Sequence, residues 1–211
     1  MTARTPRGAA GSPLPQQEVP RQLLSRPDRR ASILRGAAQA FARSGFAATS
    51  MDDVAAAGGI SRLLVYRHFD SKEQLYRAVL ERVSAALGTA WGAEVAHVGH
   101  GIGARVLLTV AREDPDGFAL LWRHAAREPG FADYAAQQRE RSTVVALRLM
   151  SGRLRDEVDT RWAASTVVAV LVESVLAWLE EGEVERDDEV VGLMAGAVAA
   201  MIASWSAAPP S

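Results

Sequence analysis

The chain has 211 residues, of which 48% are hydrophobic, and it carries a net charge of −1. This composition is that of a globular chain, long enough for one large domain or two small ones. It contains no cysteine, which excludes a disulfide framework and a thiolate metal site. Residues 1–72 hold 11 basic and 5 acidic side chains, a net +6, whereas residues 73–211 hold 13 and 20, a net −7. A basic front half favours a polyanionic partner at that end.

The first 27 residues are rich in Pro, Gly, Ser and Arg and show no periodicity. We therefore predict a disordered basic tail over 1–27. It is either a plain extension or an arm that adds affinity for a nucleic-acid backbone. Because it has no apolar run, it is not a secretory signal. The most apolar stretches, 163–179 and 190–205, fall short of the ~20 residues that span a bilayer, which predicts a soluble, cytoplasmic protein without membrane contact.

Helical periodicity begins at Asp28, which is placed to cap a helix that ends at Gly45. Ser50 and Asp53 have the spacing of a capping box for a short helix over 51–57, although Asp replaces the usual Glu. A Gly-Gly pair at 58–59 ends that helix, and one of the two glycines is able to take a positive φ.

Ser61 caps a third helix that runs to about His68, and a fourth begins after Asp70 or Ser71 and runs to about Leu87. Two short helices joined by a tight glycine turn, and braced by a longer helix, form a helix-turn-helix. The sequence therefore predicts a helix-turn-helix domain with its connecting helix over 28–87.

The remainder, 88–211, is also predicted to be helical. Pro and Gly breakers divide it into segments without strict alternation or a solenoid repeat. Helices are expected near 102–112, 115–126, 130–150, 160–180 and 187–205. The predicted fold class is all-α with about nine helices: an N-terminal three-helix helix-turn-helix domain and a C-terminal helical domain.

The short third helix carries an unusual outward face. On a helical wheel Val65 and Phe69 point inward. A solvated helix back would be rich in Glu, Lys and Gln, yet this face has no acid. It mixes cations, a phenol, an imidazole and two leucines: Arg62, Leu63, Leu64, Tyr66, Arg67 and His68.

Double-stranded DNA would explain such a face. An α-helix fits the major groove, Arg reads guanine O6 and N7, and an apolar side chain meets the thymine methyl. A Tyr hydroxyl, a Lys ammonium and a helix N-terminus suit phosphate oxygens. Lys72, the only lysine in the chain, lies in the first turn of a helix, where a cation opposes the helix dipole unless a phosphate arrives. The alternative for Leu63 and Leu64 is packing against neighbouring helices.

Residues 46–76, FAATSMDDVAAAGGISRLLVYRHFDSKEQLY, resemble the DNA-binding signature of the tetracycline-repressor (TetR/AcrR) family of transcriptional regulators. The likeness runs from about Ile33 to Val83. The family usually has a small residue or proline at position 63 and Thr, Ser or Ala at 64, so the Leu-Leu pair departs from it and bears on base preference. The resemblance implies DNA contacts at Ser50, Arg62, Leu63, Tyr66, His68 and Lys72. The helix itself adds Ser61, Leu64 and Arg67 as predicted DNA-binding residues.

The resemblance also implies that 88–211 forms a ligand-binding and dimerisation domain. The last two helices are apolar nearly all round, which a peripheral helix of a monomer is not. Small residues recur every fourth position from Gly192 to Ser204, a stripe that lets helices approach closely. Paired recognition helices must also meet half-sites about 34 Å apart. We predict a homodimer through a four-helix interface, with intrachain packing as the alternative. Its candidate residues are Val170, Ala177, Trp178, Leu193, Met194, Ala197, Met201 and Trp205.

Apolar walls with a few polar groups suit an organic effector, although aromatic residues at helical spacing are also typical of a core. Glu173, alone in an apolar helix, is the main polar candidate. It binds a cationic or hydroxylated ligand, or it pairs with an Arg across the dimer. The predicted pocket residues are Trp91, Phe118, Leu121, Trp122, His124, Phe131, Tyr134, Met150, Glu173 and Trp178.

No motif indicates catalysis. Glu94 and His97 have the Glu-x-x-His spacing of di-iron bundles, but no second copy occurs. His97 and His100 lack a third ligand, and nucleophile-elbow and phosphate-loop motifs are absent. We predict a non-enzymatic regulator without cofactor or metal, a repressor that a small organic effector releases from a palindromic operator. The alternative is a helical sensor or scaffold without DNA binding.

Overall fold

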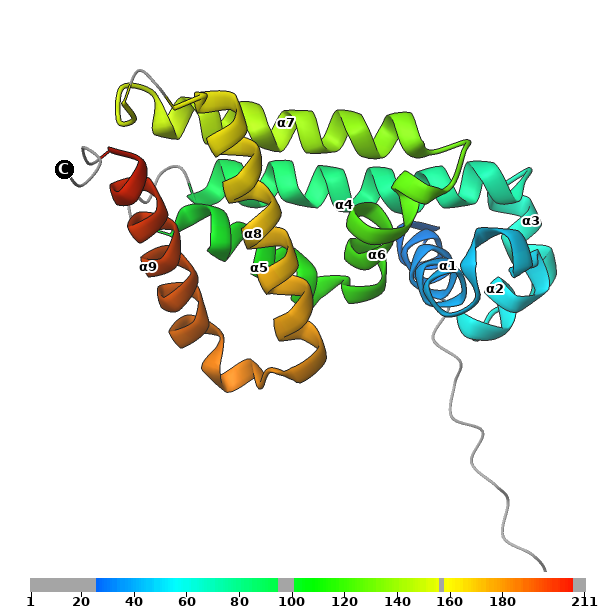
Figure 1. Cartoon of the computed structure of the whole chain (residues 1–211). Helices are drawn as coiled ribbons and strands as arrows, with labels where there is room; N and C mark the ends of the chain where they lie inside the picture. The colour runs from blue at the N-terminus through cyan, green and yellow to red at the C-terminus, as the bar shows by residue number, and fades with distance from the viewer. Residues whose placement is uncertain (1–25, 95–100, 156–157, 207–211) are drawn as a thin grey trace, which may run out of the picture.

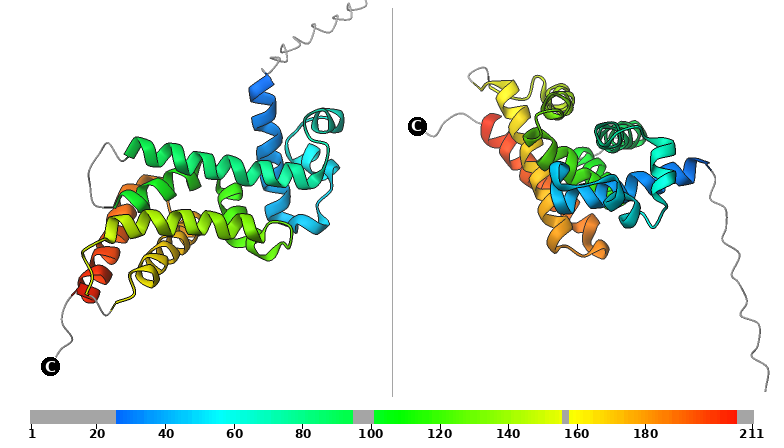
Figure 2. Two further views of the ribbon diagram at one scale, coloured as in Figure 1. Left: turned by 90° about the horizontal axis from the view of Figure 1, so that it is seen from above. Right: turned by 90° about the vertical axis from the view of Figure 1, so that its right-hand side faces the viewer.

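The computed structural model describes residues 26–94, 101–155 and 158–206, and every regular element within these ranges is helical (Figure 1). The all-α fold class is therefore confirmed for the described chain. Figures 1 and 2 show α1–α3 grouped at one end of α4, whose other end reaches the C-terminal helices. The α-helices are α1 (Arg26–Ala48), α2 (Met51–Ala57), α3 (Arg62–His68), α4 (Lys72–Glu94), α5 (Ile102–Glu113), α6 (Pro115–Ala119), α7 (Ala132–Met150), α8 (Thr160–Glu181) and α9 (Asp187–Ser206).

Side-chain caps start the two short helices. The Ser50 hydroxyl accepts a hydrogen bond from the Asp53 backbone N–H at 3.2 Å, and the Asp53 carboxylate accepts one from the Ser50 N–H at 2.8 Å. The predicted capping box is thus confirmed, and the hydrogen bonds from Ser50 lower the pKa of Asp53. Ser61 caps α3 by accepting from the Leu64 N–H at 3.3 Å. Gly59, with φ 60°, makes the turn between the two helices.

The end of α1 is fastened by a buried threonine. Gly45 has φ 78° and ψ 165° and breaks the helical geometry at the predicted position. Thr49, 2% exposed, then donates its hydroxyl to the carbonyls of Gly45 at 2.6 Å and Ala40 at 3.2 Å. This hydroxyl satisfies carbonyls that a helix end leaves without partners, and it fixes where the chain turns toward α2.

The helix-turn-helix has its own apolar core. Ile33 and Phe41 of α1, Val54 of α2, Val65 of α3 and Leu75 of α4 are all 0% exposed. The inward residues of each helix therefore converge on one cluster, and burying them stabilises the unit by roughly 1.5–3 kcal/mol per large side chain.

The C-terminal helices pack in layers against α4. α7 packs on α8, α5 lies against α4 and α8, and α9 contacts α5 more than α8. A bidentate pair joins Arg112 of α5 to Asp187 of α9, with Nε to Oδ2 at 3.0 Å and Nη2 to Oδ1 at 2.8 Å. The Trp178 indole of α8 donates to the same carboxylate at 2.7 Å. Asp187 thus links three helices.

Two predicted helices differ from those observed. The fourth extends to Glu94 rather than ending near Leu87, since neither Gly88 nor Gly92 breaks it. The segment predicted as one helix over 115–126 is three short pieces: α6, a π-helical turn over Leu120–His124 and a 3₁₀ turn over Ala125–Arg127. Such π turns are uncommon and recur at functional sites.

The two apolar C-terminal helices are longer than the sequence predicted. Thr160–Glu181 has 22 residues and Val184–Ser206 has 23, so by length and composition alone each is able to span a membrane. The expectation that both fall short was wrong. α8 packs against α5 and α7, as core helices do, whereas little of α9 is buried within one chain.

Candidate nucleic-acid interface and effector region

α3 presents an exposed, acid-free face. Val65 is 0% exposed and Phe69 is 2% exposed, so these two side chains fix the inward face as predicted. On the other side Leu63 is 71% exposed and Tyr66 is 43% exposed. Leu63 and Tyr66 thus lie on the outward face together with Arg62 and Arg67, where all four side chains are accessible to a partner.

Arg62 is held at the edge of this face. Its Nη1 lies 2.9 Å from Asp52 Oδ2 in the first turn of α2, and its guanidinium lies 5.3 Å from the centre of the Tyr66 ring. A guanidinium has five N–H donors, so one carboxylate leaves capacity for a base edge or a phosphate. Asp52 was not predicted as a partner of Arg62, because an acid ten residues before an arginine has no recognisable spacing.

The remaining predicted contacts are distributed around α3. Leu64 is partly buried against the core, which favours packing for this residue. Arg67 is exposed and His68, the last residue of α3, is half-buried. The hydroxyls of Ser50 and Ser61 serve as helix caps and lie at exposed helix N-termini, positions at which backbone N–H groups are available to an anion.

Lys72 is braced by the end of α1. Its ammonium donates to the carbonyls of Phe46 at 2.7 Å and Ala47 at 3.1 Å, and it lies 4.5 Å from the centre of the Phe46 ring. These carbonyls belong to the negative end of α1, and they offset the cost of a cation in the first turn of α4 before any phosphate arrives. An ammonium has three N–H donors, so one remains for a further acceptor.

The predicted effector pocket is largely filled with core side chains. Phe118, Leu121, Trp122, Phe131 and Met150 are at most 4% exposed. Helical spacing identified inward-facing residues correctly, but their side chains pack on one another instead of bounding a cavity. The prediction of these five as pocket walls is therefore not supported.

The other predicted pocket residues are dispersed. Trp91 and His124 are half-buried, the Tyr134 hydroxyl donates to Ser84 at 3.0 Å, and Trp178 binds Asp187. Glu173 is exposed and pairs with Arg123 of the same chain at 3.3 Å. Within one chain it does not face an apolar pocket, and its role toward a ligand or a partner subunit stays a prediction.

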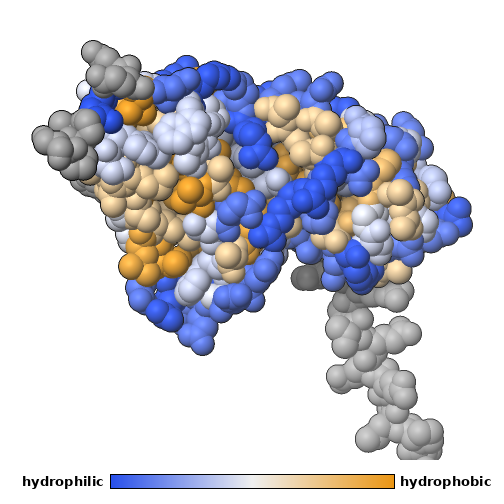
Figure 3. All heavy atoms as spheres, viewed as in Figure 1, coloured by the Kyte–Doolittle hydropathy of each residue, from blue (hydrophilic) through white to orange (hydrophobic). Residues whose placement is uncertain are grey.

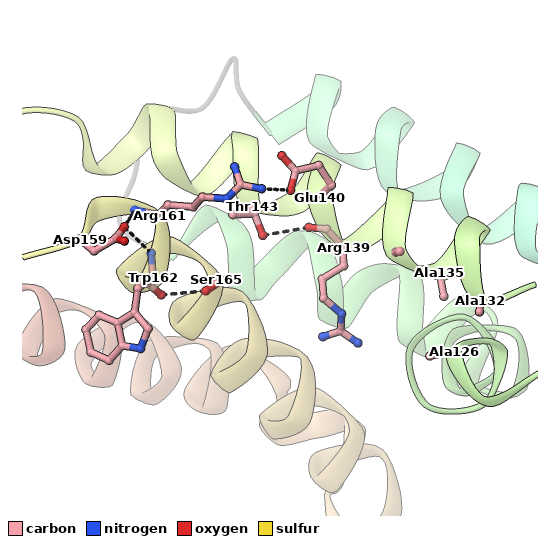
Figure 4. Close-up of a pocket in the computed structure, with 11 residues that line it drawn as sticks. Ala126, Ala132, Ala135, Arg139, Glu140, Thr143, Asp159, Arg161, Trp162 and Ser165 are labelled. Atoms are coloured by element: carbon pink, nitrogen blue, oxygen red, sulfur yellow. Dashed lines mark hydrogen bonds and ion pairs between the residues drawn. The ribbon is translucent and has the colours of Figure 1, made fainter.

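A surface groove of about 510 Å³ lies between α7 and α8 (Figure 4). Trp162, 53% exposed, lies at one side of it, and Arg161 pairs with Glu140 across it at 2.5 Å. This groove was not predicted from the sequence, since its small and charged lining residues follow no apolar period. Its lining residues are Ala126, Ala132, Ala135, Ala136, Arg139, Glu140, Thr143, Asp159, Arg161, Trp162 and Ser165.

An apolar face runs over α8 and α9 (Figure 3). A second groove, of about 430 Å³, separates the two helices there and is lined by Trp178, Leu193 and Met194 among others. Met194 itself is 7% exposed, so this predicted interface residue packs mainly within its own chain. Of the other predicted interface residues, Val170, Ala177, Leu193 and Ala197 are exposed, and Trp178, Met201 and Trp205 are half-buried.

Within the described ranges, no group of three His, Cys, Asp or Glu side chains is placed to hold a metal ion. His97 and His100, considered above as possible ligands, lie outside the residues that the structure describes, as does most of the predicted basic tail.

A capped helix-turn-helix is an arrangement typical of a DNA-binding unit. Residues 33–79 match the model of the bacterial regulatory proteins of the tetR family. This part of the chain therefore resembles the DNA-binding domain of TetR-family regulators.

Curated relatives agree with this resemblance. The chain is 29% identical over 182 residues to the HTH-type transcriptional activator FasR of Mycolicibacterium smegmatis, covering 80% of this chain and 81% of the relative. It is 46% identical over 57 residues to the HTH-type transcriptional repressor Rv3405c of Mycobacterium tuberculosis, covering 27% and 30%. These relatives are transcriptional regulators rather than enzymes.

Solved structures share the fold. A TetR-like transcriptional regulator from Rhodococcus sp. RHA1 matches with a TM-score of 0.66 and 21% identity, over 84% of this chain and 98% of that one. AibR in complex with isovaleryl coenzyme A and operator DNA matches with a TM-score of 0.59 and 19% identity, over 81% and 97%.

Proposed function

We propose that this chain is a TetR-family regulator, a homodimeric repressor that binds a palindromic operator and is released from it by a small organic effector. Residues 28–87 would act as the DNA-binding domain and residues 88–211 as the effector and dimerisation domain. The protein would act in the cytoplasm, where its operator is accessible.

The observation that carries the proposal is the exposed face of α3. Leu63, Tyr66 and Arg67 project from a helix that has no acidic residue, beside Arg62. In a major groove, Arg62 would read a guanine edge and Leu63 a thymine methyl. Lys72 and the N-termini of α2 and α3 would meet phosphates, which fix register without reading sequence.

The two-fold symmetry of a palindromic operator and the apolar face of α8 and α9 both support a dimer. A two-fold dimer would present two copies of α3 to half-sites about 34 Å apart. Leu193 is 65% exposed and Val170 is 36% exposed on this face, and an exposed apolar patch of this kind is typical of a protein interface.

Effector control is the part of the proposal that depends on the C-terminal domain and not on α3. A structural neighbour was crystallised with both an acyl coenzyme A and operator DNA, so the fold accommodates the two ligand classes in that protein. In this chain the groove between α7 and α8 is the place where an effector would bind with least repacking of the core. The effector must prefer the conformation that does not bind DNA, since only differential affinity shifts the population.

The relatives include one protein named an activator and one named a repressor. We favour repression because a dimer on an operator blocks polymerase by occupancy alone and needs no activating surface. Both outcomes use the same DNA-binding chemistry.

Operator selection from genomic DNA, followed by binding assays at several salt concentrations, tests the proposal. We expect recovery of an inverted repeat bound by the dimer, with affinity that falls steeply as salt rises. No salt-sensitive binding to any sequence would instead indicate a helical sensor or scaffold. A reporter placed behind the recovered operator then separates repression from activation.

A further inference from the structure

A cluster of aromatic rings joins the C-terminal domain to the DNA-binding unit. Phe131, which precedes α7, lies 5.3 Å from Phe46 and 4.4 Å from Tyr76, measured between ring centroids. Phe46 and Tyr76 are 5.2 Å apart, and Phe41 lies 5.0 Å from Tyr76. We call Phe41, Phe46, Tyr76 and Phe131 the ring cluster. Three of its members come from α1 and α4, and only Phe131 comes from the C-terminal domain.

The ring cluster ends on the ammonium of Lys72. The Phe46 ring packs edge to face on Phe131, and its centre lies 4.5 Å from Lys72 Nζ. The same residue supplies the carbonyl that accepts from Nζ at 2.7 Å. Phe46 therefore holds Lys72 twice, through its ring and through its backbone. A displacement of Phe131 that shifts Phe46 must also shift the lysine.

The ring cluster contains an unsatisfied polar group. The Tyr76 side chain is 0% exposed, and among the described residues its hydroxyl has no hydrogen-bond partner. Burial raises the pKa of this phenol above its ordinary value. A buried hydroxyl without a protein partner costs free energy relative to a hydrated one, so opening the cluster to water would recover this part of the cost.

We propose that Phe131 is a positioning residue for the phosphate contact of Lys72, through which the C-terminal domain controls DNA binding. With Phe131 packed, Phe46 holds the ammonium at the end of α1 with one N–H donor directed to a phosphate. When the start of α7 moves, the ring cluster loosens, Tyr76 gains water and Lys72 loses its brace. This inference rests on the proposed function, in which Lys72 meets the DNA backbone.

A double-mutant cycle on the full-length protein tests the inference. Wild type, Phe131→Leu, Lys72→Ala and the double variant are titrated against the duplex recovered by genomic selection, at salt concentrations from low to physiological. Lys72→Ala should flatten the dependence of log K on log salt by about 1.8, because the proposed dimer loses two phosphate contacts worth about 0.9 each. Phe131→Leu should flatten it by up to the same amount.

The decisive comparison is non-additivity. If Phe131 acts through Lys72, Phe131→Leu should have no further effect on affinity or on the salt dependence in the Lys72→Ala background. Phe118→Leu, the same substitution at a fully buried core residue outside the ring cluster, should leave the salt dependence at the wild-type value. Thermal unfolding by circular dichroism establishes that each variant is folded at the titration temperature.

Equal losses of affinity from Phe131→Leu in both backgrounds, with an unchanged salt dependence, would overturn the inference and leave the proposed function intact. A wild-type protein that binds no duplex in a salt-sensitive way would overturn the proposed function and this inference with it. The first result appears in the variants and the second in the wild type, so the two failures are distinguishable.

Discussion

Arg62 and Lys72 are both cations that we propose to meet DNA, but the chain holds them differently. Arg62 forms one exposed ion pair with Asp52, an interaction worth roughly 0–1 kcal/mol and easily exchanged for another acceptor. Lys72 is fixed by two carbonyls and a ring. A side chain that exchanges partners suits base readout, whereas a braced one suits a constant phosphate contact.

Replacing Arg62 by alanine should relax base preference at one operator position. The expected loss on the preferred base is about 1–3 kcal/mol, with little change on duplexes that already carry another base there. Lys72→Ala serves as the comparison, because it should weaken binding on every sequence. Quantitative binding to a library with each operator position randomised measures both. Equal losses on all sequences for the two variants would make Arg62 a phosphate contact.

At the residue scale, the sequence predicted the direction in which a side chain points from its helix better than it predicted what that side chain contacts. The helical wheel placed Val65 inward and Leu63 outward correctly, because a single helix fixes both directions. It left Leu64 undecided, since a residue at the boundary is buried or exposed according to a neighbour that no local pattern specifies. The prediction that aromatic residues line an effector pocket was not supported, for the same reason. Periodicity shows that Phe118 and Trp122 face inward but not whether the interior is filled.

The crossing of α1 and α2 depends on close backbone approach. A Cβ added at Gly36 would lie 2.6 Å from both the Cα and the N of Gly58, and 3.0 Å from the carbonyl oxygen of Val54. These neighbours are backbone atoms of α2 and of the turn that leads to α3. They are unable to move without moving the DNA-facing helix.

Gly36→Ala should therefore destabilise the protein by about 1–3 kcal/mol, the usual cost of overpacking. It should also weaken DNA binding at temperatures where the protein is still folded. Gly88→Ala is the control, and its expected effect on stability has the opposite sign. A Cβ added at this position within α4 meets nothing within 4 Å. This substitution should stabilise the protein by about 0.5–1 kcal/mol. Chemical denaturation compares the two, and a neutral Gly36→Ala would contradict the packing described.

The Asp187 junction should make stability depend on acid pH. The hydrogen bonds of Arg112, and then that of Trp178, lower the pKa of Asp187. The contribution of the junction is thus complete above the unfolded-state pKa, near 4, and is lost as pH falls through the lowered folded-state pKa. Asp187→Asn should cost about 1–2 kcal/mol at pH 7, and the difference from wild type should shrink below about pH 4.

Asp188→Asn is the matched control, one residue further along α9. Its carboxylate pairs with Arg105 at 2.9 Å but is 91% exposed, so its removal should change stability by less than about 1 kcal/mol. Denaturation curves for both variants at pH 7 and pH 3 provide the measurement. Similar losses of stability from the two substitutions at pH 7 would show that the Asp187 junction stabilises the fold no more than the exposed Asp188 pair does.

At the element scale, local chemistry predicted most helix ends. Caps and glycines at Ser50, Ser61 and Gly45 act over three or four residues, and the sequence shows them directly. The end of α4 was missed because an isolated glycine weakens a helix without having to end it, and α4 continues past Gly88 and Gly92. The π turn before Arg127 was missed because no residue pattern in this segment predicts it. Long-range contacts, unlike caps, leave no local pattern.

The assembly of the whole molecule should depend on α9. Gly196 is exposed, and a Cβ at this position meets nothing within its own chain. Gly196→Leu should therefore fold normally, since leucine favours a helix more than glycine does. In the proposed dimer it should weaken self-association at least tenfold, about 1.4 kcal/mol, by separating the partner helices.

Sedimentation equilibrium across a range of protein concentrations measures this effect. Gly88→Leu, which adds the same side chain to open space on α4, should leave the dimer constant unchanged. An unaltered constant for Gly196→Leu would place the interface elsewhere on the molecule, and operator binding by the same variants would show whether dimer formation and DNA affinity fall together.

The brace on Lys72 has a chemical consequence for the molecule as a whole. The chain contains one lysine, so its only side-chain amine sits where the C-terminal domain and the DNA-facing helices meet. Isotope-labelled reductive methylation would place a single side-chain probe there, and its NMR signal would report bound, free and effector-loaded states separately. Acylation would remove the charge, so one covalent event in each protomer would remove its proposed phosphate contact and weaken DNA binding on every sequence.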